Sequence, residues 1–315
     1  MIRYLAKRTG TALFVLFALS LLVFSMVRLI PGDPAAQYLN TSDPDPEALA
    51  AIREQLGLTR PWYEQFVVWL GGVLSGDFGT SLTRPFDITT QIAERLPASV
   101  ELAVIATIFS LLIGIPFGAL SAVRSGKIAD SVIRAASFLF LSVPAFVVGT
   151  VLILANSRTL KFPLIGYTPL WEDPVRSVVQ MLVPSMVLAL PMGAILCRYT
   201  RNTLLDSLSQ DYIRTARAKG ANTSRLVIRH ALRNALVPVT TVVGLQLGTM
   251  IGGTIIVEAI FALPGMGSML IEALNSTDYP TIQGCVLVLG AVYIAINLAV
   301  DLLYPLIDPR IRTVN

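Results

Sequence analysis

The chain has 315 residues, of which 54% are hydrophobic and only 14% are charged, and its mean hydropathy is +0.68. A soluble domain usually carries about 25% charged residues, so this composition excludes an ordinary soluble protein and predicts a polytopic membrane protein. The isoelectric point near 9.2 does not call for nucleic acid as a partner, because the basic residues gather in loops beside apolar runs.

Six apolar runs along the chain are long enough to cross ~30 Å of hydrocarbon. They occupy residues 11–30, 98–123, 131–155, 178–197, 237–257 and 281–304. The first run follows a basic head and is interpreted as an uncleaved span, because no small-residue cleavage site follows it closely. The expected fold class is therefore an all-α membrane protein with six transmembrane helices, whose last five form one core over residues 98–304.

A polar insert of 67 residues, 31–97, separates the first two spans and holds nine acidic and four basic residues. Its pattern predicts amphipathic helices over residues 42–58 and 61–74, followed by a turn at residues 76–79. We expect a small folded subdomain outside the cytoplasm. The alternative is a disordered loop, which the aromatic content of the insert disfavours.

Charge predicts the topology. The segments assigned to the inner side are 1–10, 124–134, 198–236 and the tail 305–315, and together they hold 16 Lys and Arg residues. The outer segments 31–97, 156–177 and 258–280 hold 7, although they contain more residues. This bias follows the positive-inside rule and places both termini in the cytoplasm.

The polar segment 198–236 is the feature around which the chain is organised. Its basic residues crowd into a short stretch: Arg214, Arg217, Lys219, Arg225, Arg229 and Arg233. Alanines surround Gly220, a pattern that predicts a short helix, a tight turn and a second helix. We interpret the segment as a docking site that binds a soluble partner. The alternative is a solvated basic loop that obeys only the topology rule.

Catalytic and metal-binding motifs are not found. The chain has no nucleophile elbow, no His-Glu-x-x-His and no phosphate-binding loop of the Gly-x-x-x-x-Gly-Lys type. It has one histidine, His230, and two cysteines, Cys197 and Cys285, which we expect to be buried free thiols rather than ligands. The chain is thus expected to be neither an enzyme nor a metal site, and any ATP must bind to another subunit.

Two sets of residues are candidates for a translocation path. Gln246 and Asn297 are neutral polar residues within the fifth and sixth runs, and they either line a water-filled path or form an interhelical hydrogen bond. A second set in the loop after the fifth run is interpreted either as an outer gate or as an ordinary interfacial loop: Phe261, Leu263, Pro264 and Met266.

The chain resembles a known family over nearly its whole length. The resemblance rests on the head MIRYLAKR, PGDPA after the first span, LGLTRPWYEQFVVWLGGVLSGDFGTSL, IAERLPASVELAV and YIRTARAKGANTSRLVIRHALRNALVPV. These motifs are similar to those of the membrane permease subunits of binding-protein-dependent ABC importers, in the dipeptide, oligopeptide and nickel branch. Arg214, Thr215 and Ala216 stand where the general motif has Glu-Ala-Ala before Gly220, so the first two positions depart from it.

The resemblance implies a coupling helix that docks in a cleft of a separate ATPase subunit. The residues implied are Arg214, Thr215, Ala216, Arg217, Ala218, Lys219, Gly220 and Ala221. It further implies a second similar permease, two ATPase subunits that bind ATP and Mg²⁺, an extracytoplasmic solute-binding protein, and a place in the bacterial cytoplasmic membrane. The solute stays open between peptides, nickel chelates and haem. A stand-alone facilitator or channel and a membrane scaffold are the alternatives from other classes.

Overall fold

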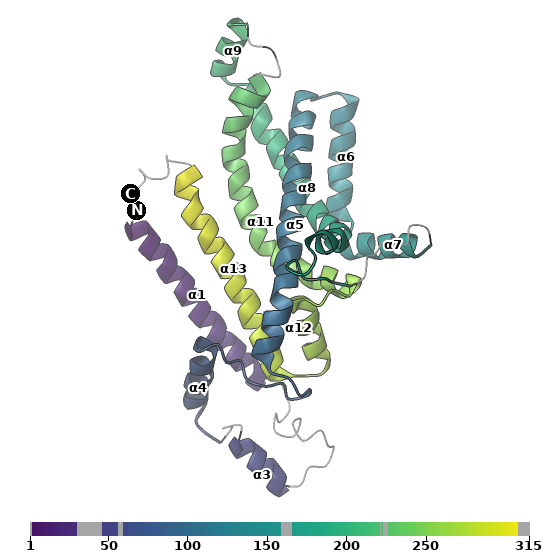
Figure 1. The fold of residues 1–315 in the computed structure, drawn as a ribbon. Coiled ribbons are helices and arrows are strands. Elements are labelled where there is room, and N and C mark those ends of the chain that lie inside the picture. Colours follow the sequence, from purple (N-terminus) through teal and green to yellow (C-terminus); the bar gives the residue numbers. More distant parts are fainter. Residues whose placement is uncertain are drawn as a thin grey trace. The chain divides into compact units, whose positions relative to one another are not determined.

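The computed structural model describes residues 2–29, 46–55, 59–158, 166–220, 222 and 226–307. These residues are nearly all helical, and a single antiparallel bridge between Thr80 and Asp87 is the only β pairing among them. The long helices are α1 (Ile2–Leu29), α5 (Ile88–Val123), α8 (Pro174–Leu208), α11 (Leu232–Phe261) and α13 (Tyr279–Ile307). The shorter helices are α3 (Pro46–Gln55), α4 (Trp62–Leu74), α6 (Ile128–Ser142), α7 (Ala145–Arg158), α9 (Asp211–Ala218), the π-helical η1 (Leu226–Ala231) and α12 (Met266–Asn275) (Figure 1).

The membrane-spanning helices confirm the expected fold class. Among the described residues, five helices are long and apolar enough to cross a membrane, and the number rises to six if α6 and α7 together count as one span. The helices expected in the insert are present as α3 and α4, and Gly76 and Gly79 adopt the left-handed backbone expected of a turn. Residues 42–45 and 56–58 of the first of these predicted helices lie outside the described residues.

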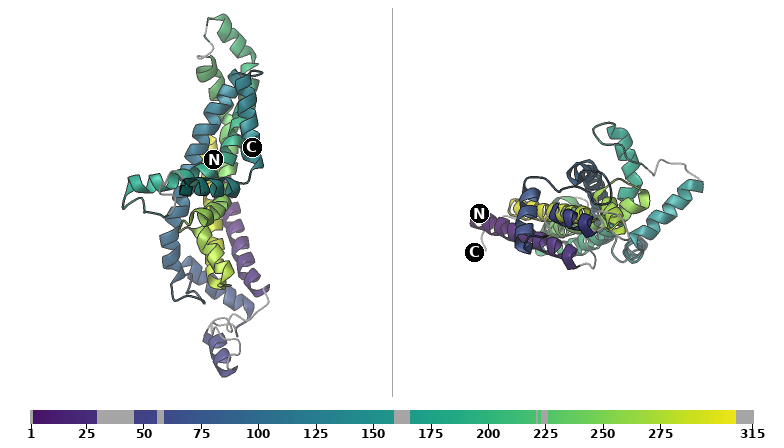
Figure 2. Two further views of the ribbon diagram at one scale, coloured as in Figure 1. Left: turned by 90° about the vertical axis from the view of Figure 1, so that its right-hand side faces the viewer. Right: turned by 90° about the horizontal axis from the view of Figure 1, so that it is seen from below.

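The third span is not one straight helix. The run predicted over residues 131–155 is divided into α6 and α7, which meet at an angle of 97° (Figures 1 and 2). Val143, before Pro144, is extended at φ −90° and ψ 121°. A proline ring disfavours the helical region for the residue before it and removes one backbone donor, so the break follows from Pro144.

The helix that holds the second predicted span begins before that span. Helix α5 starts at Ile88, ten residues ahead of Ala98, and the division between the two compact units falls between Pro97 and Ala98 within it. Asp87 fixes this start, because its Oδ2 accepts hydrogen bonds of 2.7 Å from both the backbone N–H and the Oγ1 of Thr90. These bonds lower the pKa of the Asp87 carboxyl, with the side-chain bond contributing most.

The chain divides into two compact units, and unit 1 contains residues 98–263 and 296–315. Its core lies where α8 packs against α11 and α5, and it includes the fully buried Leu102, Met181 and Leu196. Helices α5 and α8 approach closely: a Cβ atom on Gly118 would lie 2.5 Å from the carbonyl oxygen of Cys197. Small residues at such crossings let backbones pack without intervening side chains.

Unit 2 contains residues 2–97 and 264–295. Here α4 packs on α1 through edge-to-face aromatic contacts, with Phe66 5.2 Å from Phe24 and 6.0 Å from Phe17 between ring centroids. The loop before α5 is fastened to the turn between α12 and α13 by the buried Asp278. Its carboxylate accepts hydrogen bonds from the hydroxyls of Ser81 and Thr281 and from the backbone N–H of Leu82.

Candidate functional site

The polar segment 198–236 forms a helical projection at one end of unit 1. Helix α8 continues to Leu208, eleven residues beyond the predicted end of the fourth span, before a short turn leads into α9. The chain then passes Gly220 and returns through η1 into α11. Figures 1 and 2 show α9 at the same end of this unit as the turn between α5 and α6. The expected order of short helix, glycine turn and second helix is therefore present.

One side chain anchors α9 to the rest of the unit. Ile213 is 1% exposed and lies in an apolar cluster with Leu204 of α8 and Leu226 of η1. Ala216, one turn further along α9, packs against the same cluster. A second tie comes from Asn234 of α11, whose Nδ2 donates a 3.1 Å hydrogen bond to the hydroxyl of Tyr212. These contacts connect α9 to both α8 and α11.

The remaining surface of α9 is exposed and carries basic side chains. The side chains that reach solvent there are Arg214, Thr215, Arg217, Ala218 and Lys219. Arg214 forms an ion pair of 3.2 Å with Asp211, one turn earlier, and both side chains are largely exposed. Such an exposed pair contributes little to stability, so the basic groups remain available to an acidic partner. Of the eight predicted docking residues, Ala221 lies outside the described residues.

Gly220 follows α9 and adopts a backbone conformation that favours glycine. Its φ is +84°, and its N–H donates a 3.0 Å hydrogen bond to the carbonyl oxygen of Arg217. No described atom lies within 4 Å of the position that a Cβ would take. The glycine is thus explained by the left-handed turn and not by crowding within the chain.

A buried ion pair at the base of the projection joins three helices. Arg201 of α8 makes two parallel hydrogen bonds to Asp130 of α6, of 2.8 Å and 2.9 Å. The Asp130 side chain is 1% exposed and also accepts hydrogen bonds from Ser121 Oγ of α5 and from the backbone N–H of Gly126. This carboxylate fixes the α5–α6 turn to the helix that leads into α9.

Sequence reasoning missed this ion pair. Asp130 and Arg201 are 71 residues apart, and no periodicity links them. The available signal was that Asp130 is the only acidic residue among residues 124–134, which carry three basic residues. A lone acid at the end of an apolar helix indicates a buried partner, although it does not identify that partner.

Two further carboxylates of unit 1 lie on α5 and α11. Glu258 is completely buried and accepts a 2.6 Å hydrogen bond from the hydroxyl of Ser99. Glu101 accepts hydrogen bonds from the hydroxyls of Tyr167 and Ser177. Burial raises the pKa of Tyr167, and the charge of Glu101 raises it further, so the neutral, hydrogen-bond-donating phenol is favoured.

The predicted gate residues belong to different units. Phe261 and Leu263 lie in the buried core of unit 1, whereas Met266, also buried, and the exposed Pro264 belong to unit 2. The gate therefore stays a prediction.

The predicted path residues are both partly buried in unit 1. On α11, the Thr249 hydroxyl lies 3.4 Å from Gln246 Oε1. Asn297 of α13 also makes an interaction in the structure. Whether these two side chains line a path stays a prediction.

Metal ligands do not cluster in the part of the chain that the structure describes: no three His, Cys, Asp or Glu side chains there are placed to hold an ion. Cys197 and Cys285 are both buried and free, as the sequence predicts.

Two sequence-family models together match most of the chain. Residues 114–313 match the family described as the inner membrane component of binding-protein-dependent transport systems. Residues 1–103 match the N-terminal part of the membrane component of such systems.

Curated relatives match nearly the whole chain. The probable peptide ABC transporter permease protein y4tP of Sinorhizobium fredii is 38% identical over 310 residues, covering 98% of this chain and 99% of the relative. The dipeptide transport system permease protein DppB of Escherichia coli is 38% identical over 336 residues, covering 99% of each chain. A structure of the MetNI methionine ABC transporter, in an inward-facing conformation, superposes with a TM-score of 0.56 at 21% identity. It covers 70% of this chain and 98% of that chain, a likeness in fold alone.

Proposed function

The chain belongs to the family of binding-protein-dependent transport system inner membrane components, and on this basis we propose that it is a permease subunit of an ATP-driven importer of di- or oligopeptides. The peptide substrate is supported by the relatives named as peptide and dipeptide permeases, which match nearly the whole chain. The chain itself contributes no catalytic group. ATP and Mg²⁺ bind to two separate ATPase subunits, and a second, homologous permease completes the path.

The observation that carries the proposal is the construction of α9. Ile213 packs α9 against residues of α8 and α11, while the basic side chains of α9 are exposed to solvent. A partner that moves α9 therefore moves two membrane helices with it. Acidic groups in a cleft of the ATPase are the complementary surface, because Arg217 and Lys219 carry no ion pair to any residue that the structure describes.

The mechanism that fits this construction is alternating access. ATP binding closes the two ATPase subunits, which draw the segments around Gly220 together, and α8 and α11 rock to open the path outward. Hydrolysis then resets the transporter. On this proposal α9 and both termini lie in the cytoplasm, and the extracytoplasmic insert 31–97 receives the solute-binding protein. Gln246 and Asn297 line the path, and the segment from Phe261 to Met266 closes its outer mouth.

Charge reversal on α9 tests the docking role. The variant with Arg217→Glu and Lys219→Glu should lose at least about 90% of the ATPase subunit that co-purifies with the permease, because two attractions become repulsions. The matched control is Arg176→Glu, an exposed arginine at the opposite end of α8. The control should retain the ATPase subunit. Equal retention by the double variant and the control would contradict docking through α9.

Reconstitution separates the importer from the facilitator and the substrate alternatives. Proteoliposomes that hold both permeases, the ATPase subunits and the binding protein should take up a labelled dipeptide only when ATP is present. Uptake by the permease alone would favour a facilitator. ATP-driven uptake of a nickel chelate or haem without uptake of peptides would retain the importer and replace its substrate.

A further inference from the structure

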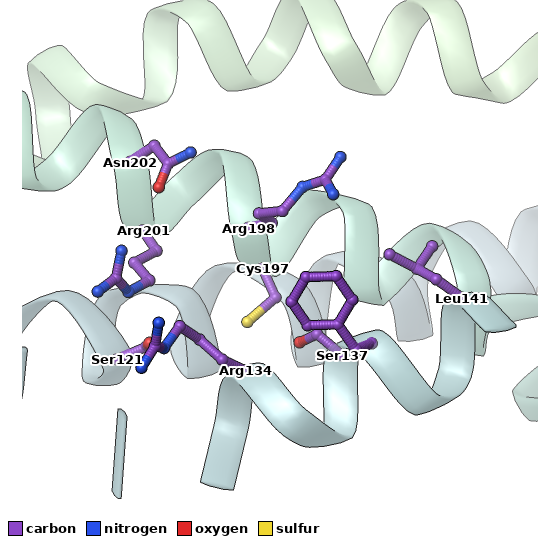
Figure 3. A pocket seen from close by; sticks show the side chains of 9 residues that line it. Ser121, Arg134, Ser137, Leu141, Cys197, Arg198, Arg201 and Asn202 are labelled. Atoms are coloured by element: carbon purple, nitrogen blue, oxygen red, sulfur yellow. The ribbon is translucent and has the colours of Figure 1, made fainter. Parts of the chain in front are cut away.

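A pocket of about 180 Å³ lies between α6 and α8, with Ser121 of α5 beside it (Figure 3). Side chains spaced by three and four residues line it from α6, namely Arg134, Ser137, Phe138 and Leu141. From α8 it receives Cys197, Arg198, Arg201 and Asn202. None of these residues belongs to the docking face of α9, and the transport mechanism above does not use the pocket.

The cations of the pocket outnumber its anions. Arg134 and Arg201 extend toward Ser121 at one end, and both pair with the same carboxylate, Asp130 (Figure 3). Arg198 rises from α8 beside Cys197 and forms no ion pair with any residue that the structure describes. Two of the three guanidinium groups thus share one carboxylate, and the third has none. The excess of two positive charges is complementary to an anion with several oxygen acceptors.

The other end of the pocket is apolar. Leu141 lies seven residues after Arg134 on α6, about 10 Å along the helix, and Phe138 between them is 62% exposed. The neighbouring Leu139 is 57% exposed, so the mouth of the pocket opens beside apolar surface of α6, which together with α7 is a candidate membrane span. A ligand that fits must be anionic at one end and apolar at the other.

We propose that this pocket binds the phosphate headgroup of an anionic phospholipid, with one acyl chain lying along Phe138 and Leu141. Basic pockets between membrane helices at the cytoplasmic side are suited to such headgroups. The polarity of the pocket has the matching direction: its basic end lies beside the α5–α6 turn, which carries Arg124 and Lys127. The assignment to the inner leaflet rests on the proposed orientation of α9, whereas binding of the lipid does not.

Lipid retention by the purified full-length chain tests the site without ATPase or transport. Native mass spectrometry in detergent is used to titrate phosphatidylglycerol, phosphatidylcholine of the same chain length and inorganic phosphate. Arg198→Ala should weaken phosphatidylglycerol binding about fivefold to tenfold, the effect of one charge-assisted contact. Arg198→Lys should retain most of the binding. The matched control is Arg124→Ala, which removes an exposed charge from the same side of the unit but not from the pocket.

Saturable binding of phosphatidylglycerol that is lost in Arg198→Ala and kept in Arg124→Ala supports the proposal. Equal losses in both variants would indicate only general surface charge and would overturn it. Displacement of phosphatidylglycerol by millimolar inorganic phosphate would overturn the lipid assignment in favour of a free-anion site. Because Arg198 is exposed and unpaired among the described residues, its replacement should not unfold the chain, and Arg198→Glu provides a second variant with a larger expected loss.

Discussion

Removal of the Asp130 carboxylate should destabilise the end of unit 1 that carries α9. Asp130→Ala leaves the Arg201 guanidinium, whose side chain is only 17% exposed, without its bidentate partner. It also removes the acceptor for Ser121 and for the backbone N–H of Gly126. Breaking a buried pair by removing one partner costs about 3–5 kcal/mol, because the remaining charge is left uncompensated.

This magnitude predicts a clear shift in thermal stability. With about 2 °C lost per kcal/mol in a chain of this size, the midpoint of unfolding should fall by roughly 6–10 °C. The chain contains its own control, since Asp211 forms an ion pair with Arg214 while its side chain is 94% exposed. Asp211→Ala should cost less than about 1 kcal/mol and leave the midpoint almost unchanged.

The assay is thermal unfolding of the detergent-purified chain, followed by tryptophan fluorescence and by recovery of the monodisperse species. A third variant, Asp130→Ala with Arg201→Met, removes both charges and should recover at least about half of the loss, because apolar residues replace buried ion pairs at little cost. Equal midpoints for Asp130→Ala and Asp211→Ala, or no recovery in the double variant, would refute the assignment of this ion pair as a structural tie.

Three further predictions follow from other contacts. Gly118→Ala should lower the free energy of unfolding by about 1–3 kcal/mol, because the added Cβ overpacks the crossing of α5 and α8. The control is Gly71→Ala, where the added Cβ meets no atom within 4 Å and the unfolding midpoint should stay unchanged or rise slightly. Equal effects of the two changes would contradict the close approach of α5 and α8. Asp278→Ala should release the loop before α5 and speed chymotryptic cleavage after Phe86 several-fold, and an unchanged cleavage rate would exclude the role of Asp278 in holding this loop. Since the folded pKa of Tyr167 is raised above its unfolded value near 10, stability should fall as pH rises above about 10, and Tyr167→Phe should reduce this fall; the same pH dependence in both proteins would contradict it.

The long helices could be predicted from sequence because their signal is local. Runs of about 20 apolar residues fix where a helix can span, and each long helix coincides with most or all of one predicted run. The docking segment was equally accessible, since basic residues around a glycine between two apolar runs indicate a water-exposed turn. The structure adds that α9 is buried through Ile213 and that its basic side chains are exposed to solvent.

The features missed by sequence reasoning depend on distant residues or on cooperative geometry. The ion pair between Asp130 and Arg201 and the hydrogen bond from Ser81 to Asp278 join residues that are far apart in the chain. The bend before Pro144 was a different kind of error, because a proline within a membrane run permits either a mild kink or a complete break. Packing of α7 against α8 and α11 accompanies the break, and the local sequence does not report it.

The most direct test of the account is where a cysteine placed on α9 lies in the assembled importer. Cys197 and Cys285 are both buried, so Ala218→Cys introduces an exposed thiol that can be labelled selectively. Trp171→Cys, in the loop before α8, is the exposed control. The account predicts that the thiol at position 218 reacts only from the cytoplasmic side and forms a cross-link to the ATPase subunit, while the control does neither. Labelling of position 218 from outside the cell, or a cytoplasmic thiol that never cross-links to the ATPase subunit, would contradict the central claim.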